Sequence, residues 1–192
     1  MSEFVSRAGL KLEHALNVFA IEVRGMLCAD FGANVGGFTD CLLRRGAAKV
    51  YAIDTGHGAL DWKLRNDPRV IVMERTNAMH VTLPEPVDLV TIDVAWTKQR
   101  HILPAARRVL SPMGQVVTLI KPHYEAEPRL LRNGVLPADD VETVIQSVAV
   151  DVRAATFEIV QTTPSPIRGA KGNVEVIALL RLISLESASA KC

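Results

Sequence analysis

Two charged residues stand at strand ends, where they could carry out chemistry together. Asp93 and Lys121 each directly follow an apolar run that is typical of a buried strand. A lysine is costly to bury without a partner, so this placement favours a functional ion pair over a lysine whose head merely reaches solvent. A carboxylate at the end of a strand also points into the crevice where chemistry would occur. The two residues therefore predict a functional ion pair at the ends of the strands.

A glycine-rich segment, residues 30–40, joins a predicted strand over residues 26–31 to a predicted helix over residues 37–45. Strand, glycine turn and helix begin a doubly wound sheet, whose ligands bind beyond the carboxyl ends of the strands. Three residues separate Gly32 from Gly36, which departs from the G-x-G-x-x-G pattern of dinucleotide-binding dehydrogenases. The spacing favours a smaller nucleoside-type cofactor, with S-adenosylmethionine (SAM) as the first candidate. A tight turn without a ligand is the alternative from this segment alone.

Two further polar residues follow the next two predicted strands. Asp54 ends the strand predicted over residues 50–54, where its carboxylate can bind ribose hydroxyls or cap the next turn. Asn77 follows the strand predicted over residues 70–73, where its amide can pair with an adenine edge or close an Asx-turn. Placed together with the glycine turn, these residues favour a bound nucleoside.

The remaining apolar patterns predict an α/β fold with helices on both faces of one sheet. Nearly continuous runs of Val, Ile and Leu are typical of strands that are covered on both faces. The short connection between the last two predicted strands indicates an antiparallel pair at the end of the sheet. A seven-stranded, mostly parallel sheet with an antiparallel C-terminal hairpin strand is typical of Rossmann-like SAM-dependent methyltransferases. The other predicted strands cover residues 87–93, 116–120, 157–162 and 174–183, and the other predicted helices cover residues 6–19, 60–65 and about 102–110, with a last one beginning at Asp139.

The amino-terminal segment, residues 1–24, is predicted to be helical, with Ser6 as its N-cap. One stripe of this helix is apolar, and Leu12, Leu16 and Phe19 form it. Another stripe is polar and largely basic, and it consists of Arg7, Lys11 and His14.

Composition excludes several classes of protein. The 192 residues, of which 48% are hydrophobic, fit a single domain over 1–192 with a sizeable core. A net charge of +1 argues against nucleic-acid binding by the whole surface but allows a local basic face. Cys28, Cys41 and Cys192 lack metal-ligand spacing, so we expect no metal and a reducing, cytoplasmic compartment. No signal region or apolar run long enough to span a bilayer is evident, so we expect no membrane partner.

Several segments in a fixed order carry a resemblance to a known family. They are residues 5–12, 30–40, 92–94, 120–122, 163–167 and 172–175, and the match runs from about Phe4 to Arg181. These segments resemble the FtsJ/RrmJ-like methyltransferases, most closely the TlyA branch, whose members are also labelled hemolysin-like. The resemblance implies SAM-dependent 2'-O-methylation of ribose in RNA, with ribosomal RNA or ribosomal subunits as partners. It implies a Lys-Asp-Lys-Glu tetrad that falls on Lys11, Asp93, Lys121 and Glu175.

The resemblance also implies which residues contact the cofactor, and the basic stripe of the amino-terminal helix indicates which residues contact the RNA. The SAM contacts fall on Gly32, Gly36, Phe38, Asp54, Asn77 and Asp93. We expect Arg7 and Lys11, on the basic stripe of the amino-terminal helix, to hold RNA phosphates. Members of the TlyA branch begin with an S4 RNA-binding domain, and this sequence starts where that domain would end. The loop over residues 123–134 lacks the glycine-lysine-rich pattern expected there.

Three other functions fit the residues less well. A SAM-binding, RNA-associated protein with little catalysis would not need the four residues of the tetrad. A nicotinamide oxidoreductase is disfavoured by the spacing of the glycines. A membrane-active hemolysin is disfavoured because the sequence has no spanning segment and no strongly amphipathic basic helix.

Overall fold

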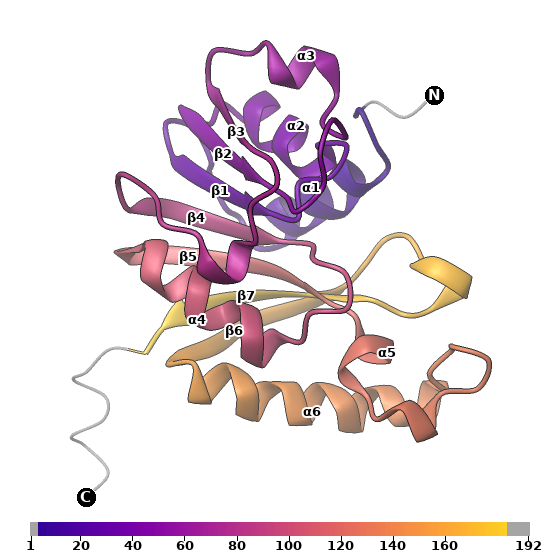
Figure 1. The fold of residues 1–192 in the computed structure, drawn as a ribbon. Helices are drawn as coiled ribbons and strands as arrows, with labels where there is room; N and C mark the ends of the chain where they lie inside the picture. The colour runs from indigo at the N-terminus through magenta and orange to yellow at the C-terminus, as the bar shows by residue number, and fades with distance from the viewer. Residues whose placement is uncertain (1–3, 184–192) are drawn as a thin grey trace, which may run out of the picture.

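The computed structural model describes residues 4–183, which form one sheet between two layers of helices (Figure 1). The strands are β1 (Leu27–Phe31), β2 (Lys49–Ile53), β3 (Val70–Met73), β4 (Val87–Ile92), β5 (Leu110–Ile120), β6 (Phe157–Pro164) and β7 (Val176–Leu182). The α-helices are α1 (Ala8–Val18), α2 (Gly37–Arg44), α3 (Trp62–Arg65), α4 (Gln99–Val109), α5 (Pro122–Glu125) and α6 (Ala138–Ala154). Short 3-10 helices are η1 (Ala78–His80), η2 (Pro128–Leu130) and η3 (Ala170–Gly172).

The sheet has the predicted topology. Its strand order is β3-β2-β1-β4-β5-β7-β6. The pairs among β1 to β5 are parallel, whereas β7 is antiparallel to both of its neighbours, β5 and β6. The prediction of a seven-stranded, mostly parallel sheet with an antiparallel C-terminal hairpin strand is therefore confirmed.

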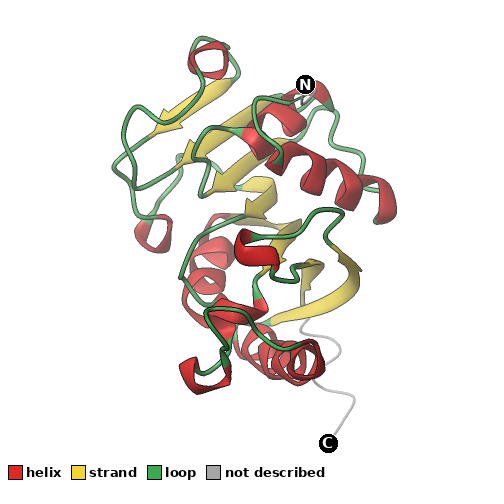
Figure 2. Cartoon of the chain, turned by 90° about the vertical axis from the view of Figure 1, so that its right-hand side faces the viewer, coloured by secondary structure: helices red, strands yellow, loops and turns green. Residues whose placement is uncertain are grey.

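Helices lie on both faces of the sheet (Figure 2). Alternate side chains of the strands enter two separate cores, one on each face. In β1, Cys28 faces the core that α1 and α2 cover. Its neighbours Ala29 and Phe31 face the core that α4 and α6 cover. This arrangement explains why the strands read as continuous apolar runs, since a parallel strand in such a sheet is buried on both faces.

Helix α1 occupies the middle of the predicted helical segment and packs on α2. Leu12 and Leu16 of the predicted apolar stripe are almost fully buried, at 0% and 1% exposed. The predicted N-cap is wrong, because Arg7 occupies that position without a side-chain capping bond. Ser6 lies instead against Gly37, the first residue of α2, where an added Cβ would lie 2.3 Å from the Ser6 hydroxyl oxygen. This close approach sets the beginning of α1 beside the glycine turn.

Most element bounds differ by one or two residues from those predicted, and three differences bear on how the elements begin. The strand predicted to begin at Val116 begins at Leu110, which pairs with Val87 on the far side of an irregularity in the ladder. The helix predicted near residues 102–110 starts earlier and keeps Pro104 in its interior. The last helix begins at Ala138 with Pro137 at the N-cap, so Asp139 lies in the first turn instead of capping it.

Cys28 and Cys41 are buried, and burial raises the pKa of each thiol to about 12. Cys192 lies outside the described residues. Across residues 4–183, no helix is both long and apolar enough to cross a membrane. The same part of the chain holds no group of three His, Cys, Asp or Glu side chains arranged to bind a metal ion.

The strand order reverses between β1 and β4, and the residues that follow these two strands touch. Gly32 follows β1 with φ +87°, a conformation that a residue with a Cβ rarely adopts. An added Cβ would lie 2.7 Å from the backbone oxygen of Asp93, which follows β4. Both the backbone angle and the contact therefore require glycine at this crossing point.

Replacing Gly32 tests this contact, and Gly25 provides a matched control. Gly25 also has a positive φ, +80°, but an added Cβ would meet nothing within 4 Å. We expect Gly25→Ala to lower the free energy of unfolding by about 1 kcal/mol through backbone strain alone. Gly32→Ala should lower it by roughly 1–2 kcal/mol more, because the clash adds to the strain. Urea denaturation measures both, and equal losses would contradict the close contact.

A buried carboxyl group lies beneath the same turn. Asp30 in β1 is 0% exposed and accepts hydrogen bonds from the hydroxyls of Thr39, at 2.7 Å, and Thr91, at 3.0 Å. These bonds join β1 to α2 and to β4. Burial raises the pKa of Asp30 to about 7, against the lowering effect of the two hydroxyl donors.

The raised pKa predicts how stability depends on pH. Between about pH 4 and pH 7 the unfolded chain loses the Asp30 proton while the folded chain keeps it, so this residue lowers stability as pH rises through that window. Asp30→Asn removes the effect. From about pH 5 to about pH 8, the free energy of unfolding of the unsubstituted protein should fall by on the order of 3 kcal/mol relative to that of the variant. Parallel urea-denaturation profiles for the two proteins would contradict this assignment.

Candidate active site

The topology brings chemically useful residues to one edge of the sheet. Asp54, Asp93 and Lys121 follow the parallel strands β2, β4 and β5, so they lie at the carboxyl edge. Glu175 precedes β7, and because β7 is antiparallel its first residues lie at that same edge. Ile120 of β5 pairs with Val176 of β7, which places Glu175 beside Lys121.

The predicted ion pair between Asp93 and Lys121 is present. The Nζ of Lys121 lies 2.7 Å from Oδ1 of Asp93, with the two side chains 13% and 19% exposed. The same Nζ donates a hydrogen bond to the backbone oxygen of Val94 at 3.0 Å. The lysine is thus anchored to the segment that follows β4 and is not free to reach outward.

A second ion pair connects the first helix to the last strand. The Nζ of Lys11 in α1 lies 2.5 Å from Oε2 of Glu175, and the two side chains are 10% and 4% exposed. Gly169 packs so closely over Glu175 that an added Cβ would lie 2.3 Å from Oε1. An ion pair this deeply buried loses so much hydration that stability alone does not account for it.

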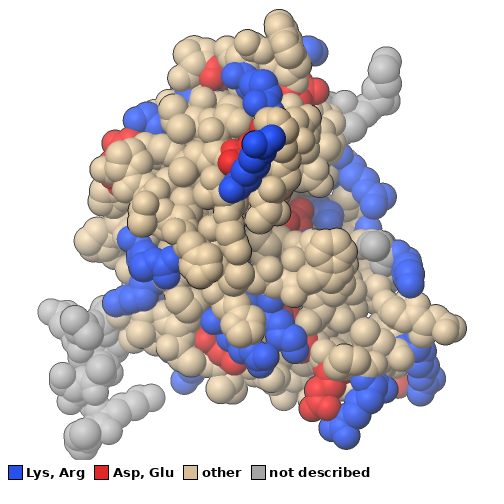
Figure 3. Space-filling view, in the orientation of Figure 1, with Lys and Arg blue, Asp and Glu red and all other residues tan. Residues whose placement is uncertain are grey.

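The four residues of the predicted tetrad line one cavity of about 450 Å³, which we call the tetrad cavity. Arg7 and Phe38 also line it. The structure therefore gathers residues from α1, β4, β5 and β7 into one concave site. Acidic and basic atoms also meet in a hollow on the face shown in Figure 3.

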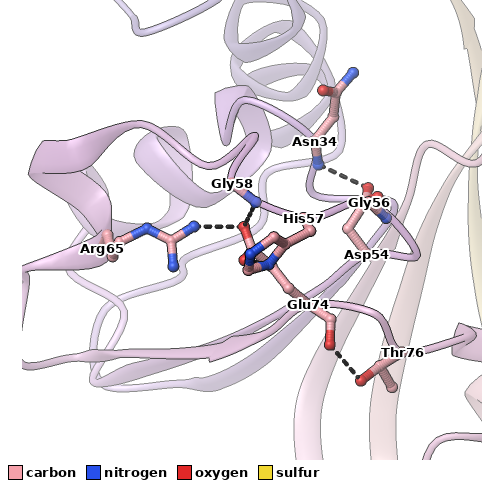
Figure 4. A network of polar contacts seen from close by, with 8 residues as sticks. All are labelled: Asn34, Asp54, Gly56, His57, Gly58, Arg65, Glu74 and Thr76. Atoms are coloured by element: carbon pink, nitrogen blue, oxygen red, sulfur yellow. Dashed lines mark hydrogen bonds and ion pairs between the residues drawn. The ribbon is translucent and has the colours of Figure 1, made fainter.

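A second cavity, of about 420 Å³, lies beside the end of β2, and we call it the Asp54 cavity. The Asp54 carboxylate accepts backbone hydrogen bonds from Asn34 at 2.9 Å and from Gly56 at 2.6 Å (Figure 4). Asn34 belongs to the glycine turn, so these bonds tie that turn to the loop after β2. A carboxylate has about four acceptor positions, and two therefore stay available to a ligand.

Glu74 holds the loop after β2 in place from the end of β3 (Figure 4). Its carboxylate accepts a hydrogen bond from the backbone N–H of Gly58 at 2.9 Å, and it also contacts Arg65 and His57. The Gly58 N–H, Arg65 and His57 together lower the pKa of Glu74 to about 2. The loop that carries Gly56, one of the two partners of Asp54, is therefore fixed by a charged group.

The other predicted cofactor contacts divide between the two cavities. Asn77 lines the Asp54 cavity, and its side-chain oxygen accepts a hydrogen bond from the backbone of Met79 at 2.9 Å, closing an Asx-turn. Phe38 is buried and lines the tetrad cavity instead. Gly36 lines neither cavity, because Leu64 and Leu60 occupy the space where its Cβ would lie, at 2.3 and 2.8 Å.

The two cavities meet at the crossing point of the sheet. Gly32, Asn34, Asp93 and Ala95 line both of them. A molecule that fills the Asp54 cavity can therefore present one end to the tetrad. The arrangement suits the transfer of a group from a bound cofactor to an acceptor in the tetrad cavity.

Sequence reasoning missed three ring-bearing residues near this site. His123 and Tyr124 line the tetrad cavity, and their ring centroids lie 4.2 Å apart. Trp96 lines the Asp54 cavity, 6.1 Å from the Tyr124 ring. Their positions directly after Asp93 and Lys121, at strand ends, are the signal that could have found them.

Comparison with known proteins agrees with this geometry. Hemolysin A of Brachyspira hyodysenteriae is 42% identical over 182 residues, which cover 92% of this chain and 76% of the relative. The 16S/23S rRNA (cytidine-2'-O)-methyltransferase TlyA of Mycobacterium tuberculosis is 42% identical over 194 residues, which cover 98% of this chain and 72% of the relative. A solved structure of a proposed hemolysin from Streptococcus thermophilus superposes with a TM-score of 0.92 at 39% identity, covering 96% of this chain and 69% of that one.

The family model for FtsJ-like methyltransferases matches residues 4–182, nearly the whole of the described chain. The match spans every helix and strand of the described residues. The chain belongs to the FtsJ-like methyltransferase family.

Proposed function

We propose that this protein is a SAM-dependent RNA methyltransferase that methylates a ribose 2'-hydroxyl of ribosomal RNA. SAM occupies the Asp54 cavity, and the acceptor nucleotide enters the tetrad cavity. The observation that carries the proposal is the junction at Asp93, where the two cavities meet beside both ion pairs. Relatives named rRNA (cytidine-2'-O)-methyltransferases support the choice of acceptor.

The Asp54 cavity fits the nucleoside part of SAM. Its volume of about 420 Å³ lies within the usual range for small-molecule sites. Asp54 keeps acceptor positions for the two ribose hydroxyls, while its backbone bonds to Asn34 and Gly56 hold it in place. Asn77 lies on the same wall, where its amide can meet the base. When bound, SAM supplies a methyl group on a positively charged sulfur.

The tetrad prepares the acceptor hydroxyl. A ribose hydroxyl is a weak nucleophile and needs a group that takes its proton. Nζ of Lys121 is the group in the tetrad cavity that we assign to accept that proton. Asp93 orients Lys121, and Glu175 holds Lys11 in the same cavity. Correct alignment of the hydroxyl oxygen with the methyl group supplies much of the remaining acceleration.

The amino-terminal segment supports RNA binding beside the tetrad. Arg7 is exposed and lines the tetrad cavity, so its guanidinium can hold a phosphate of the acceptor strand. Lys11 is paired with Glu175 inside the cavity, where it meets the acceptor nucleotide rather than the outer backbone. A ribosomal substrate places the reaction in the cytoplasm.

Asp54→Ala tests the cofactor site. Losing the bonds from a charged carboxylate to the ribose should weaken the binding of SAM and S-adenosylhomocysteine by about 1.5–3 kcal/mol, measured by calorimetry. Glu85→Ala is a matched control, since Glu85 accepts hydrogen bonds from Lys49 and Tyr51, each at 2.6 Å, away from both cavities. Unchanged SAM affinity in Asp54→Ala, or preferential binding of NAD, would reject the assignment of this cavity.

Lys121→Ala tests the reaction. Incubation with tritiated SAM and ribosomal subunits should show methyl transfer lowered at least about 100-fold, with SAM affinity within a few-fold of the parent. Lys49→Ala removes another ion-paired lysine, 2.6 Å from Glu85, and should leave transfer unchanged. Equal losses of SAM binding and transfer in Lys121→Ala would assign the lysine to the cofactor site. No transfer by the unsubstituted protein would overturn the proposed function.

A further inference from the structure

A buried imidazole in the tetrad cavity has an unmet hydrogen bond. His123 lies in the first turn of α5, two residues after Lys121, and is 7% exposed. Its Nδ1 is buried and has no hydrogen-bond partner among the described residues. Buried polar atoms are nearly always paired, so an unpaired one needs an explanation. Because His123 lines the tetrad cavity, a group that enters the cavity can supply the missing partner.

The charged groups around His123 already have partners of their own. Lys121 is bonded to Asp93 and to the backbone oxygen of Val94. Glu175 is paired with Lys11. Nδ1 of His123 therefore forms no hydrogen bond with the ion pairs beside it. The reaction derived above assigns no role to His123.

The surroundings keep the imidazole neutral. Burial lowers the pKa of His123, Glu175 raises it and Lys121 lowers it, with a net lowering. The Tyr124 ring packs against the imidazole, with ring centroids 4.2 Å apart. A neutral imidazole offers one donor and one acceptor, which suits a neutral polar group of a nucleotide better than a phosphate. The exposed Arg7 at the same cavity is the residue suited to a phosphate.

We propose that His123 hydrogen-bonds a neutral polar group of the acceptor nucleotide and thereby positions its ribose against Lys121. The inference rests on the proposed function and adds a residue for acceptor recognition. It predicts that the imidazole gains its partner only when the acceptor enters. The free protein therefore does not depend on that hydrogen bond for its stability.

Two substitutions separate this role from a structural one. His123→Leu puts an apolar side chain in the same place and removes both the donor and the acceptor. His123→Gln keeps a neutral donor and acceptor. His101→Leu is the control, because His101 is exposed on α4 and lines neither the tetrad cavity nor the Asp54 cavity. The measurements are thermal unfolding, SAM affinity by calorimetry, and kcat/KM for methyl transfer to unmethylated ribosomal subunits.

We expect His123→Leu to lower kcat/KM for the subunits about tenfold, which is the usual effect of losing one hydrogen bond to the substrate. SAM binding should not weaken. Its unfolding temperature should stay the same or rise, because the substitution removes an unpaired buried polar atom. His123→Gln should recover kcat/KM to within about threefold of the parent, and His101→Leu should match the parent.

Three results would overturn the proposal. One is unchanged kcat/KM in His123→Leu. Another is a His123→Leu protein that loses thermal stability and SAM affinity together, which would show that the imidazole supports the fold. A third is a His123→Gln protein as impaired as His123→Leu, which would show that shape matters and hydrogen bonding does not. If the unsubstituted protein transfers no methyl group to the subunits, the proposed function fails, and this inference fails with it.

Discussion

The buried ion pair between Lys11 and Glu175 is the contact on which the tetrad cavity depends. It joins two residues that are 164 positions apart in the sequence, one in α1 and the other directly before β7. Lys11 reaches the pair because Gly37 lets the start of α1 lie directly against α2. Glu175 reaches it because β7 runs opposite to the other strands. Since a buried pair gains little stability over apolar packing, we expect its main effect to be the placement of these two side chains in the cavity.

The two cavities are held in place by different forces. Around Asp54, the loop after β2 is held by hydrogen bonds from backbone N–H groups to the carboxylates of Asp54 and Glu74, the latter with a low pKa. The shape of the Asp54 cavity is therefore set mainly by hydrogen bonds between neighbouring loops. In the tetrad cavity, side chains from distant elements are held by attraction between opposite charges. The Asp54 cavity therefore depends on neighbouring loops, whereas the tetrad cavity depends on the complete fold. They share Gly32 and Asp93, where β1 and β4 end.

The sequence predicts most of the strands, because a strand that is buried on both faces is a continuous apolar run. It also predicts that residues at the ends of parallel strands lie close together, because those ends share the carboxyl edge of the sheet. Asp93 and Lys121 could be paired in this way, whereas Glu175 was placed by resemblance alone. The same reasoning failed for Ser6, whose contact with Gly37 arises from tertiary packing. It also missed His123, because the burial of that residue depends on segments that are distant in the sequence.

The place of β7 in the sheet has a consequence for how the protein is made. β7 lies between β5 and β6, yet among the strands of residues 4–183 it comes last in the sequence. A nascent chain that ends before residue 176 can form β1 to β5 but leaves one side of β5 unpaired. It also lacks Val176, whose pairing with Ile120 sets Glu175 beside Lys121. The four side chains of the tetrad cavity are therefore brought together only when synthesis has reached β7.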